Sequence, residues 1–179
     1  MIFILLAAFF TGLLSKLTDL IEEHGLKLPL IFARISGIIY GFLIAFVVFV
    51  SPELSALWVA VVVSLLVLGK INSSGHYLGI ASMAVSLVFL GVSEINVFYL
   101  LLFFSVSFAE EIVNDKIVDK NKIKNKLLNE FMKLRPLIEL TALIVSFVSG
   151  KWIIWLGILA FDFGYILMEK TGSYFSQKL

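Results

Sequence analysis

The sequence predicts an all-α integral membrane protein, a polytopic helical bundle of about seven spans. Of the 179 residues, 60% are hydrophobic and 15% are charged, and the mean hydropathy is +1.05. Soluble domains are nearer half apolar and a quarter charged. The charged residues also collect between long apolar runs. So short a chain has no core large enough to hide this much apolar surface from water, so we expect lipid to be its solvent.

The apolar runs define the expected helices in chain order. They cover residues 1–18, 29–50, 54–69, 77–93, 95–112, 137–149 and 151–168. Helix is the expected state because a backbone in lipid has no other hydrogen-bond partners. The first run lacks the positive start and cleavage site of a signal peptide, so we interpret it as a retained span. The last two runs form either two spans or a re-entrant hairpin, which leaves five or six spans as alternatives within one transmembrane domain, 1–179.

Lysine and arginine predict which side each connection faces. The connections after the first, third and fifth runs carry most of these residues, and the alternate connections carry one, Lys151. Because cytoplasmic connections are enriched in lysine and arginine, seven spans would place the N-terminus outside and the C-terminus in the cytoplasm of a multi-pass cell-membrane protein.

Residues 114–135 are expected to form a cytoplasmic, basic, amphipathic connection. In "KIKNKLLNEFMKL" (122–134), leucine, isoleucine and phenylalanine fall broadly on one helical side and lysine and asparagine on the other. Such a helix is suited to lie on an anionic leaflet. The alternative is that its lysines attract a phosphate-bearing substrate.

Two similar strings suggest an internal repeat. "KLPLI" (27–31) opens the second run and "KLRPLI" (133–138) opens the sixth, and each follows an acidic stretch. This placement would fit a parallel 3+1+3 arrangement. Chance similarity between short apolar strings is the alternative.

The first polar cluster is "KLTDLIEEHG" (16–25). On a continuing helix Asp19, Glu22 and Glu23 have the spacing i, i+3, i+4 and share a face. Like charges on one face repel, so either Lys16 or a divalent cation is expected to compensate them.

The second polar cluster is "GKINSSGHYLG" (69–79), whose turn would present Lys70, Asn72 and His76 together. A helix starting near Gly75 would aim free N–H groups at this turn and offer an anion site. "SSGHYLGIASMA" resembles the Pro-Ser-Gly-His segment of the phosphatidic-acid phosphatase family. Ser73 replaces the proline and no second histidine follows His76, so membership is not inferred.

The third polar cluster is "EEIVNDKIVD" (110–119). Glu111, Asp115 and Asp119 form one acidic stripe, with Glu110 and Asn114 beside it. Oxygen ligands of this kind suit Mg²⁺, Mn²⁺ or Ca²⁺. Asn-Asp-x-x-x-Asp resembles the Asn-Asp-rich motif of membrane prenyltransferases, which implies a Mg²⁺ that bridges carboxylates to a diphosphate. Val118 stands where that motif has an aspartate.

Two acids lie deeper in the apolar runs. Asp162 interrupts the seventh run and Glu139 lies one turn into the sixth. An ionisable group inside a span is costly and usually faces a cavity or a partner.

Together these clusters predict an integral membrane enzyme with a cytoplasm-facing site for a lipid or isoprenoid phosphate and for Mg²⁺ or Mn²⁺. The expected metal ligands are Asp19, Glu22, Glu23, Glu111, Asp115 and Asp119. The expected substrate contacts are Lys70, Asn72 and Asn114. The expected catalytic residues are His76, Lys70 and Asp162. Cysteine chemistry is excluded because the chain has no cysteine.

Two alternatives stay open. One is a small cation- or proton-coupled transporter or channel that uses Asp162 and Glu139. The other is an assembly subunit that packs through "GIIYG" (37–41). In each case we expect membrane lipids as partners and no nucleic acid, while the oligomeric state is not specified by the sequence.

Overall fold

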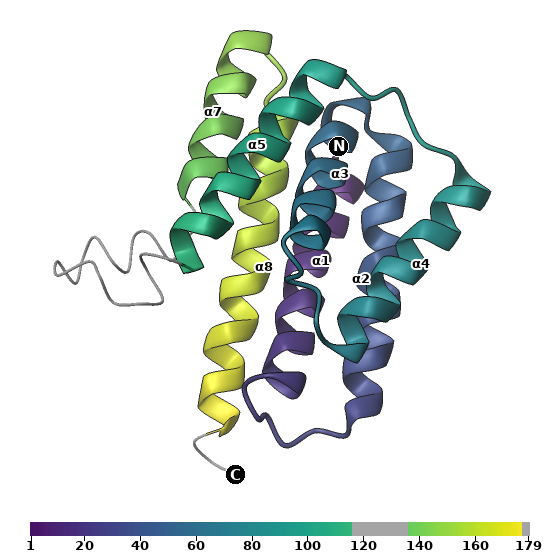
Figure 1. The fold of residues 1–179 in the computed structure, drawn as a ribbon, viewed down its shortest axis with the longest axis vertical. Coiled ribbons are helices and arrows are strands. Elements are labelled where there is room, and N and C mark those ends of the chain that lie inside the picture. The colour runs from purple at the N-terminus through teal and green to yellow at the C-terminus, as the bar shows by residue number, and fades with distance from the viewer. Residues whose placement is uncertain (116–135, 177–179) are drawn as a thin grey trace, which may run out of the picture.

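The computed structural model describes residues 1–115 and 136–176 and is all-helical (Figure 1). Seven α-helices and no strand make up these two ranges. They are α1 (Ile2–Glu22), α2 (Leu30–Val50), α3 (Pro52–Val67), α4 (Ser74–Leu90), α5 (Val97–Val113), α7 (Pro136–Ser149) and α8 (Ile153–Ser176). Each predicted apolar run coincides with one of these helices. The predicted amphipathic connection, from residue 116 onward, lies outside the described residues.

Local sequence signals explain where several helices begin and end. Ser51 accepts a hydrogen bond from the Leu54 N–H at 3.4 Å, with Pro52 as the first residue of α3. Asn96 caps α5 by accepting from the Tyr99 N–H at 3.1 Å. The connection after α4 begins at Gly91, whose φ of 88° is a conformation that residues with a Cβ rarely adopt.

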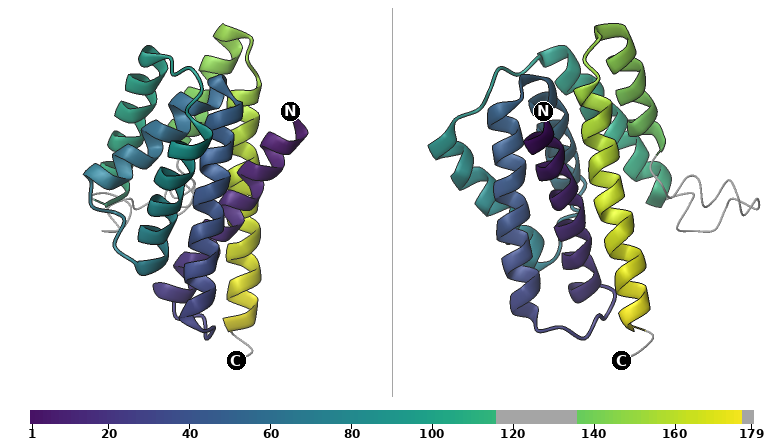
Figure 2. Two further views of the ribbon diagram at one scale, coloured as in Figure 1. Left: turned by 90° about the vertical axis from the view of Figure 1, so that its right-hand side faces the viewer. Right: turned by 180° about the vertical axis from the view of Figure 1, so that it is seen from behind.

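The helices run alternately up and down the bundle. The connections after α1 and α3 and the C-terminal end of α8 lie toward the lower end of Figure 1, and the N-terminus and the α7–α8 turn lie toward the upper end. α1 packs between α2 and α8, as the reverse view in Figure 2 shows, α3 packs against α5, and α4 packs chiefly against α2. The described connections after α1 and α3, each of which carries a lysine, therefore lie on the same side of the bundle, whereas the connection with most of the lysines lies outside the described residues.

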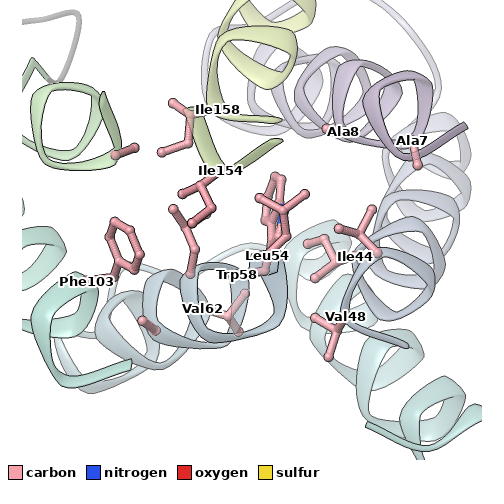
Figure 3. Packing of buried hydrophobic residues seen from close by; sticks show 14 of the residues in the cluster. Ala7, Ala8, Ile44, Val48, Leu54, Trp58, Val62, Phe103, Ile154 and Ile158 are labelled. Carbon is pink, nitrogen blue, oxygen red and sulfur yellow. The ribbon is translucent and has the colours of Figure 1, made fainter. Parts of the chain in front are cut away.

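The hydrophobic core lies where α3 meets α2, α5 and α8, and Ala7 and Ala8 of α1 extend it. Leu54 and Trp58 of α3 face Ile44 of α2 and Ile154 of α8, and Phe103 of α5 closes one side (Figure 3). Leu54, Phe103 and Ile154 are fully buried. This core positions α1, α2 and α8, which together carry most of the polar site.

Glycine brings α2 and α4 into backbone contact. A Cβ on Gly37 would overlap the Gly75 carbonyl, and a Cβ on Gly41 would overlap the Gly79 carbonyl. These four residues form two Gly-x-x-x-Gly pairs packed face to face, and we call them the glycine seam. The "GIIYG" spacing is thus used inside the chain, to join α2 to α4.

Two helices in the described part of the chain are long and apolar enough to cross a membrane, α1 and α2. A buried core helix of a soluble protein and an N-terminal signal sequence pass the same test of length and composition. α3, α4 and α7 are apolar but shorter, with 16, 17 and 14 residues. Membrane residence is therefore supported weakly, and the number of spans stays a prediction.

Gly41→Ala tests the seam. We expect it to lower the free energy of unfolding by about 1–3 kcal/mol, because the new methyl group meets backbone that has to shift, despite the gain of about 1 kcal/mol in helix propensity. Ala81→Ser is the control, because it also adds one heavy atom but on an exposed face of α4. The measurement is thermal unfolding in detergent; equal midpoints for Gly41→Ala and the wild type would contradict the seam.

Candidate functional site

Asp19 is the centre of a polar network at one end of the bundle. It lies in the last turn of α1, because that helix continues to Glu22. Its Oδ1 is 2.6 Å from Nε2 of His76 on α4, and its Oδ2 accepts a hydrogen bond of 3.0 Å from the Tyr165 hydroxyl on α8. One carboxylate therefore connects three helices that are distant in sequence.

His76 is held at both ring nitrogens. Nε2 faces Asp19, and Nδ1 lies 2.7 Å from the hydroxyl of Tyr40 on α2. Tyr40 is buried, with 5% of its surface exposed, and its hydroxyl passes close to Gly79 on the glycine seam. The imidazole is thus fixed between a carboxylate and a phenol.

Lys16 supplies a buried positive charge beside this network. The residue is 5% exposed; its ammonium donates to the Tyr165 hydroxyl at 3.3 Å and pairs with Glu169 at 3.6 Å. It also lies 4.6 Å from the centre of the Tyr165 ring. Lys16 therefore reaches Asp19 through Tyr165, and it is one of the two compensating cations that the sequence suggested.

Glu22 occupies the N-terminal end of α4. Its carboxylate accepts from the Gly75 N–H, at 2.9 Å to Oε2 and 3.2 Å to Oε1, and from the Ser74 hydroxyl. A carboxylate is favourable here because helix N-termini carry unpaired N–H groups and partial positive charge. The sequence predicted that these N–H groups would be open to an external anion, whereas Glu22 fills the position.

Glu23 completes a group with metal-ligand chemistry. One carboxylate oxygen each from Asp19 and Glu23 and one ring nitrogen of His76 all lie within 4.8 Å of one another. Carboxylates suit both Mg²⁺ and Mn²⁺, and the imidazole nitrogen favours the transition metal, Mn²⁺, over Mg²⁺. Glu23 is exposed, so a cation has a direct approach from solvent.

The acids at the end of α5 form a separate cluster. Lys70 pairs with Asp115, and its ammonium is 4.0 Å from Glu111. Glu110 caps α7 by accepting from the N–H groups of Leu137 at 2.7 Å and Ile138 at 3.3 Å. This cluster is therefore already neutralised in part by a lysine and by a helix end.

The predicted site residues are divided between these places. Asp19, Glu22, Glu23 and His76 come together at the α1 end, and Lys70, Glu111 and Asp115 come together at the α5 end. Asn72 is exposed in the α3–α4 connection, and Oδ1 of Asn114 is buried with no hydrogen-bond partner among the described residues. Asp162 is half-buried midway along α8, and Glu139 is half-buried in the first turn of α7. Asp119 lies outside the described residues.

Tyr40 and Tyr165 were not singled out by the sequence. Tyr165 lies three residues after Asp162 and four before Glu169, so it shares a face of α8 with both acids. Tyr40 lies inside "GIIYG", where the glycine spacing indicated close packing. The sequence signal that could have identified them is a tyrosine on the same helix face as acidic residues, for Tyr165, or between closely spaced glycines, for Tyr40.

Comparison of the chain with known protein families, with curated proteins and with solved structures finds no match. The site is therefore interpreted from its own chemistry.

Glu22→Ala tests the cap on α4. We expect the free energy of unfolding to fall by about 0.5–2 kcal/mol, as for other lost N-terminal caps. Glu23→Ala is the control, since it removes the same charge one residue later from an exposed side chain. Thermal unfolding in the presence of EDTA measures both; equal losses would mean that the carboxylate of Glu22 acts only through its charge.

Proposed function

We propose that this chain is a multi-pass integral membrane enzyme whose polar site binds a divalent cation and acts on the phosphate group of a lipid or isoprenoid. The observation that carries the proposal is the convergence of Asp19, Glu23 and His76, whose ligand atoms lie within 4.8 Å of one another. We assign the metal to these three residues. The acids at the end of α5 are the second choice, because Lys70 already pairs with them.

Exposed apolar side chains support residence in a membrane. Val88 and Phe89 of α4 are 81% and 84% exposed, and Phe147 and Val148 of α7 are 76% and 80% exposed. Soluble monomers rarely expose large contiguous apolar surfaces. Trp152 is half exposed at the α7–α8 turn and Tyr77 at the start of α4, positions suited to the two membrane interfaces. The 3+1+3 repeat stays a proposal, with its two strings at the starts of α2 and α7.

The position of the site supports a phosphate head group as its substrate. Asp19, Glu22 and His76 lie at the ends of apolar helices, the level at which lipid phosphates meet a bundle that spans a bilayer. When bound, a divalent cation neutralises phosphate charge and stabilises a leaving oxygen. The side chains at hand suit the rest of such chemistry, because His76 can exchange a proton and Lys16 carries a positive charge that contacts the same Tyr165 hydroxyl as Asp19. The orientation predicted for seven spans, with the N-terminus outside and the C-terminus in the cytoplasm, would place this site on the cytoplasmic side of the membrane.

Binding of Mn²⁺ or Mg²⁺ is the first test. We expect Mn²⁺ to raise the thermal unfolding midpoint of the detergent-purified protein and EDTA to reverse the rise; at a concentration of 100 Kd, binding adds about 2.7 kcal/mol. Asp19→Asn should abolish the rise, and Asp115→Asn should leave it. The control is Glu53→Gln, at the opposite end of the bundle, where Glu53 pairs with Lys151 at 3.5 Å.

The outcome separates the two acid clusters. If the Mn²⁺-dependent rise in the unfolding midpoint disappears in Asp115→Asn but persists in Asp19→Asn, the metal is assigned to the acids at the end of α5. No rise with Mn²⁺, Mg²⁺ or Ca²⁺ would end the metal proposal. If the rise is found, turnover of lipid and isoprenoid phosphates is measured next, and His76→Ala should abolish it while Glu53→Gln does not.

A second candidate function is transport of a cation or a proton-coupled solute. A continuous series of polar contacts runs from buried Tyr40 through His76, Asp19, Tyr165 and Lys16 to Glu169, whose side chain is 56% exposed. Groups that exchange protons along such a series favour a proton path. Asp162 lies on α8 between this network and the other end of the bundle.

Uptake into proteoliposomes tests transport. If the chain is a transporter, Asp162→Asn should abolish most uptake of the cation, because a neutral amide neither balances the charge of a cation nor carries a proton. Glu139→Gln should reduce uptake. Glu53→Gln is again the control. Full uptake by both Asp162→Asn and Asp19→Asn would remove this candidate, because Asp19 is the centre of the polar series.

A further inference from the structure

The orientation of the His76 ring has a structural cause outside the three ligand residues. A histidine that binds a metal through Nε2 usually donates its other ring N–H to an oxygen, which fixes the tautomer and the plane of the ring. In this chain that oxygen is the hydroxyl of Tyr40, 2.7 Å from Nδ1. Because Tyr40 comes from α2 and is buried, its hydroxyl is a fixed partner for the ring.

The Asp19 carboxylate has an equivalent partner. Tyr165 donates to Oδ2 at 3.0 Å, and the Tyr165 hydroxyl itself accepts from Lys16 at 3.3 Å. The carboxylate is therefore held at one oxygen, and its other oxygen, Oδ1, faces Nε2 of His76 at 2.6 Å. This contact is a hydrogen bond, so a cation would take the place of the proton between Nε2 and Oδ1. Ligand atoms about 2.1 Å from one ion are roughly 3 Å apart at right angles, so the imidazole and the carboxylate would also have to separate and turn toward the ion.

We propose that Tyr40 and Tyr165 are positioning residues of the cation site: each hydroxyl holds the far side of one ligand, Tyr40 that of His76 and Tyr165 that of Asp19, and so directs Nε2 and Oδ1 at the same ion. This inference rests on the proposed metal site. The inference adds two residues, one on α2 and one on α8, that do not touch the cation but set the affinity of the site for it. Removing such an outer partner typically weakens metal binding by about 10–100-fold.

The glycine seam allows the Tyr40 hydroxyl to reach Nδ1 of His76. A Cβ on Gly79 would overlap the Tyr40 hydroxyl. The Tyr40 ring can therefore lie against α4 only because position 79 has no side chain. The seam thereby links helix packing to the orientation of His76. A matched control exists in Tyr77, which neighbours His76 in sequence but whose side chain is 59% exposed.

Mn²⁺ binding to the full-length protein in detergent tests the inference. Isothermal titration gives the affinity, and the electron paramagnetic resonance spectrum of bound Mn²⁺ reports the ligand geometry. We expect Tyr40→Phe and Tyr165→Phe each to weaken Mn²⁺ binding by about 10–100-fold and to alter the spectrum, and Tyr77→Phe to do neither. Both substitutions keep the ring and remove only the hydroxyl, and having two variants covers the case in which one does not fold.

The failures of the inference and of the proposed function are distinguishable. Wild-type affinity in both Tyr40→Phe and Tyr165→Phe would overturn the inference while the metal site stands. Weaker binding with an unchanged spectrum would also overturn it, because the hydroxyls would then act through general stability. A wild-type protein that binds no Mn²⁺ would overturn the proposed metal site and the inference with it.

Discussion

The backbone contact between α2 and α4 is the constraint on which the polar site depends. Gly37 and Gly41 leave no side chain between the helices, so α4 lies directly against α2 at Gly75 and Gly79. His76 is carried on α4 immediately after Gly75, and it meets Tyr40 from α2 and Asp19 from α1 because the helices are this close. A larger residue in the seam would move α4 outward and take His76 away from both partners. Four residues without side chains thus determine the geometry of a network of polar ones.

Carboxylates determine which helix ends meet. Glu22 of α1, which is partly exposed, is bound by the start of α4, and Glu110 of α5, which is buried, is bound by the start of α7. An unpaired buried charge is strongly destabilising, so the contact of Glu110 matters most. The partial positive charge of a helix N-terminus serves as the partner in both cases. Because each carboxylate belongs to one helix and its partner to another, these contacts select the packing as well as stabilise it.

The two acid clusters differ in what already neutralises them, and this difference directs the functional proposal. At the end of α5 the ammonium of Lys70 pairs with Asp115 and lies near Glu111. At the end of α1, Asp19 is held by an imidazole and a phenol, groups that also serve as outer or inner partners in metal sites. Glu23 adds an exposed carboxylate there. The network beyond Asp19 extends through Tyr165 and Lys16 to the surface, which is why proton movement is the competing function.

The helices and the shared faces of the acids could be predicted from the sequence. Apolar runs bounded by Pro, Gly, Ser and Asn predicted all the helices of the described ranges, because helix formation and burial in an apolar medium depend on residues near in sequence. The spacing of Asp19, Glu22 and Glu23 predicted a shared face for the same reason. Long-range packing is needed to explain why Lys70 contacts α5 while His76 contacts α1, and why Glu22 caps α4. It also brings Tyr40 to His76 and Tyr165 to Asp19. Those choices depend on which helices pack together and how closely, and the periodicity of a single helix carries no information about the distance to another.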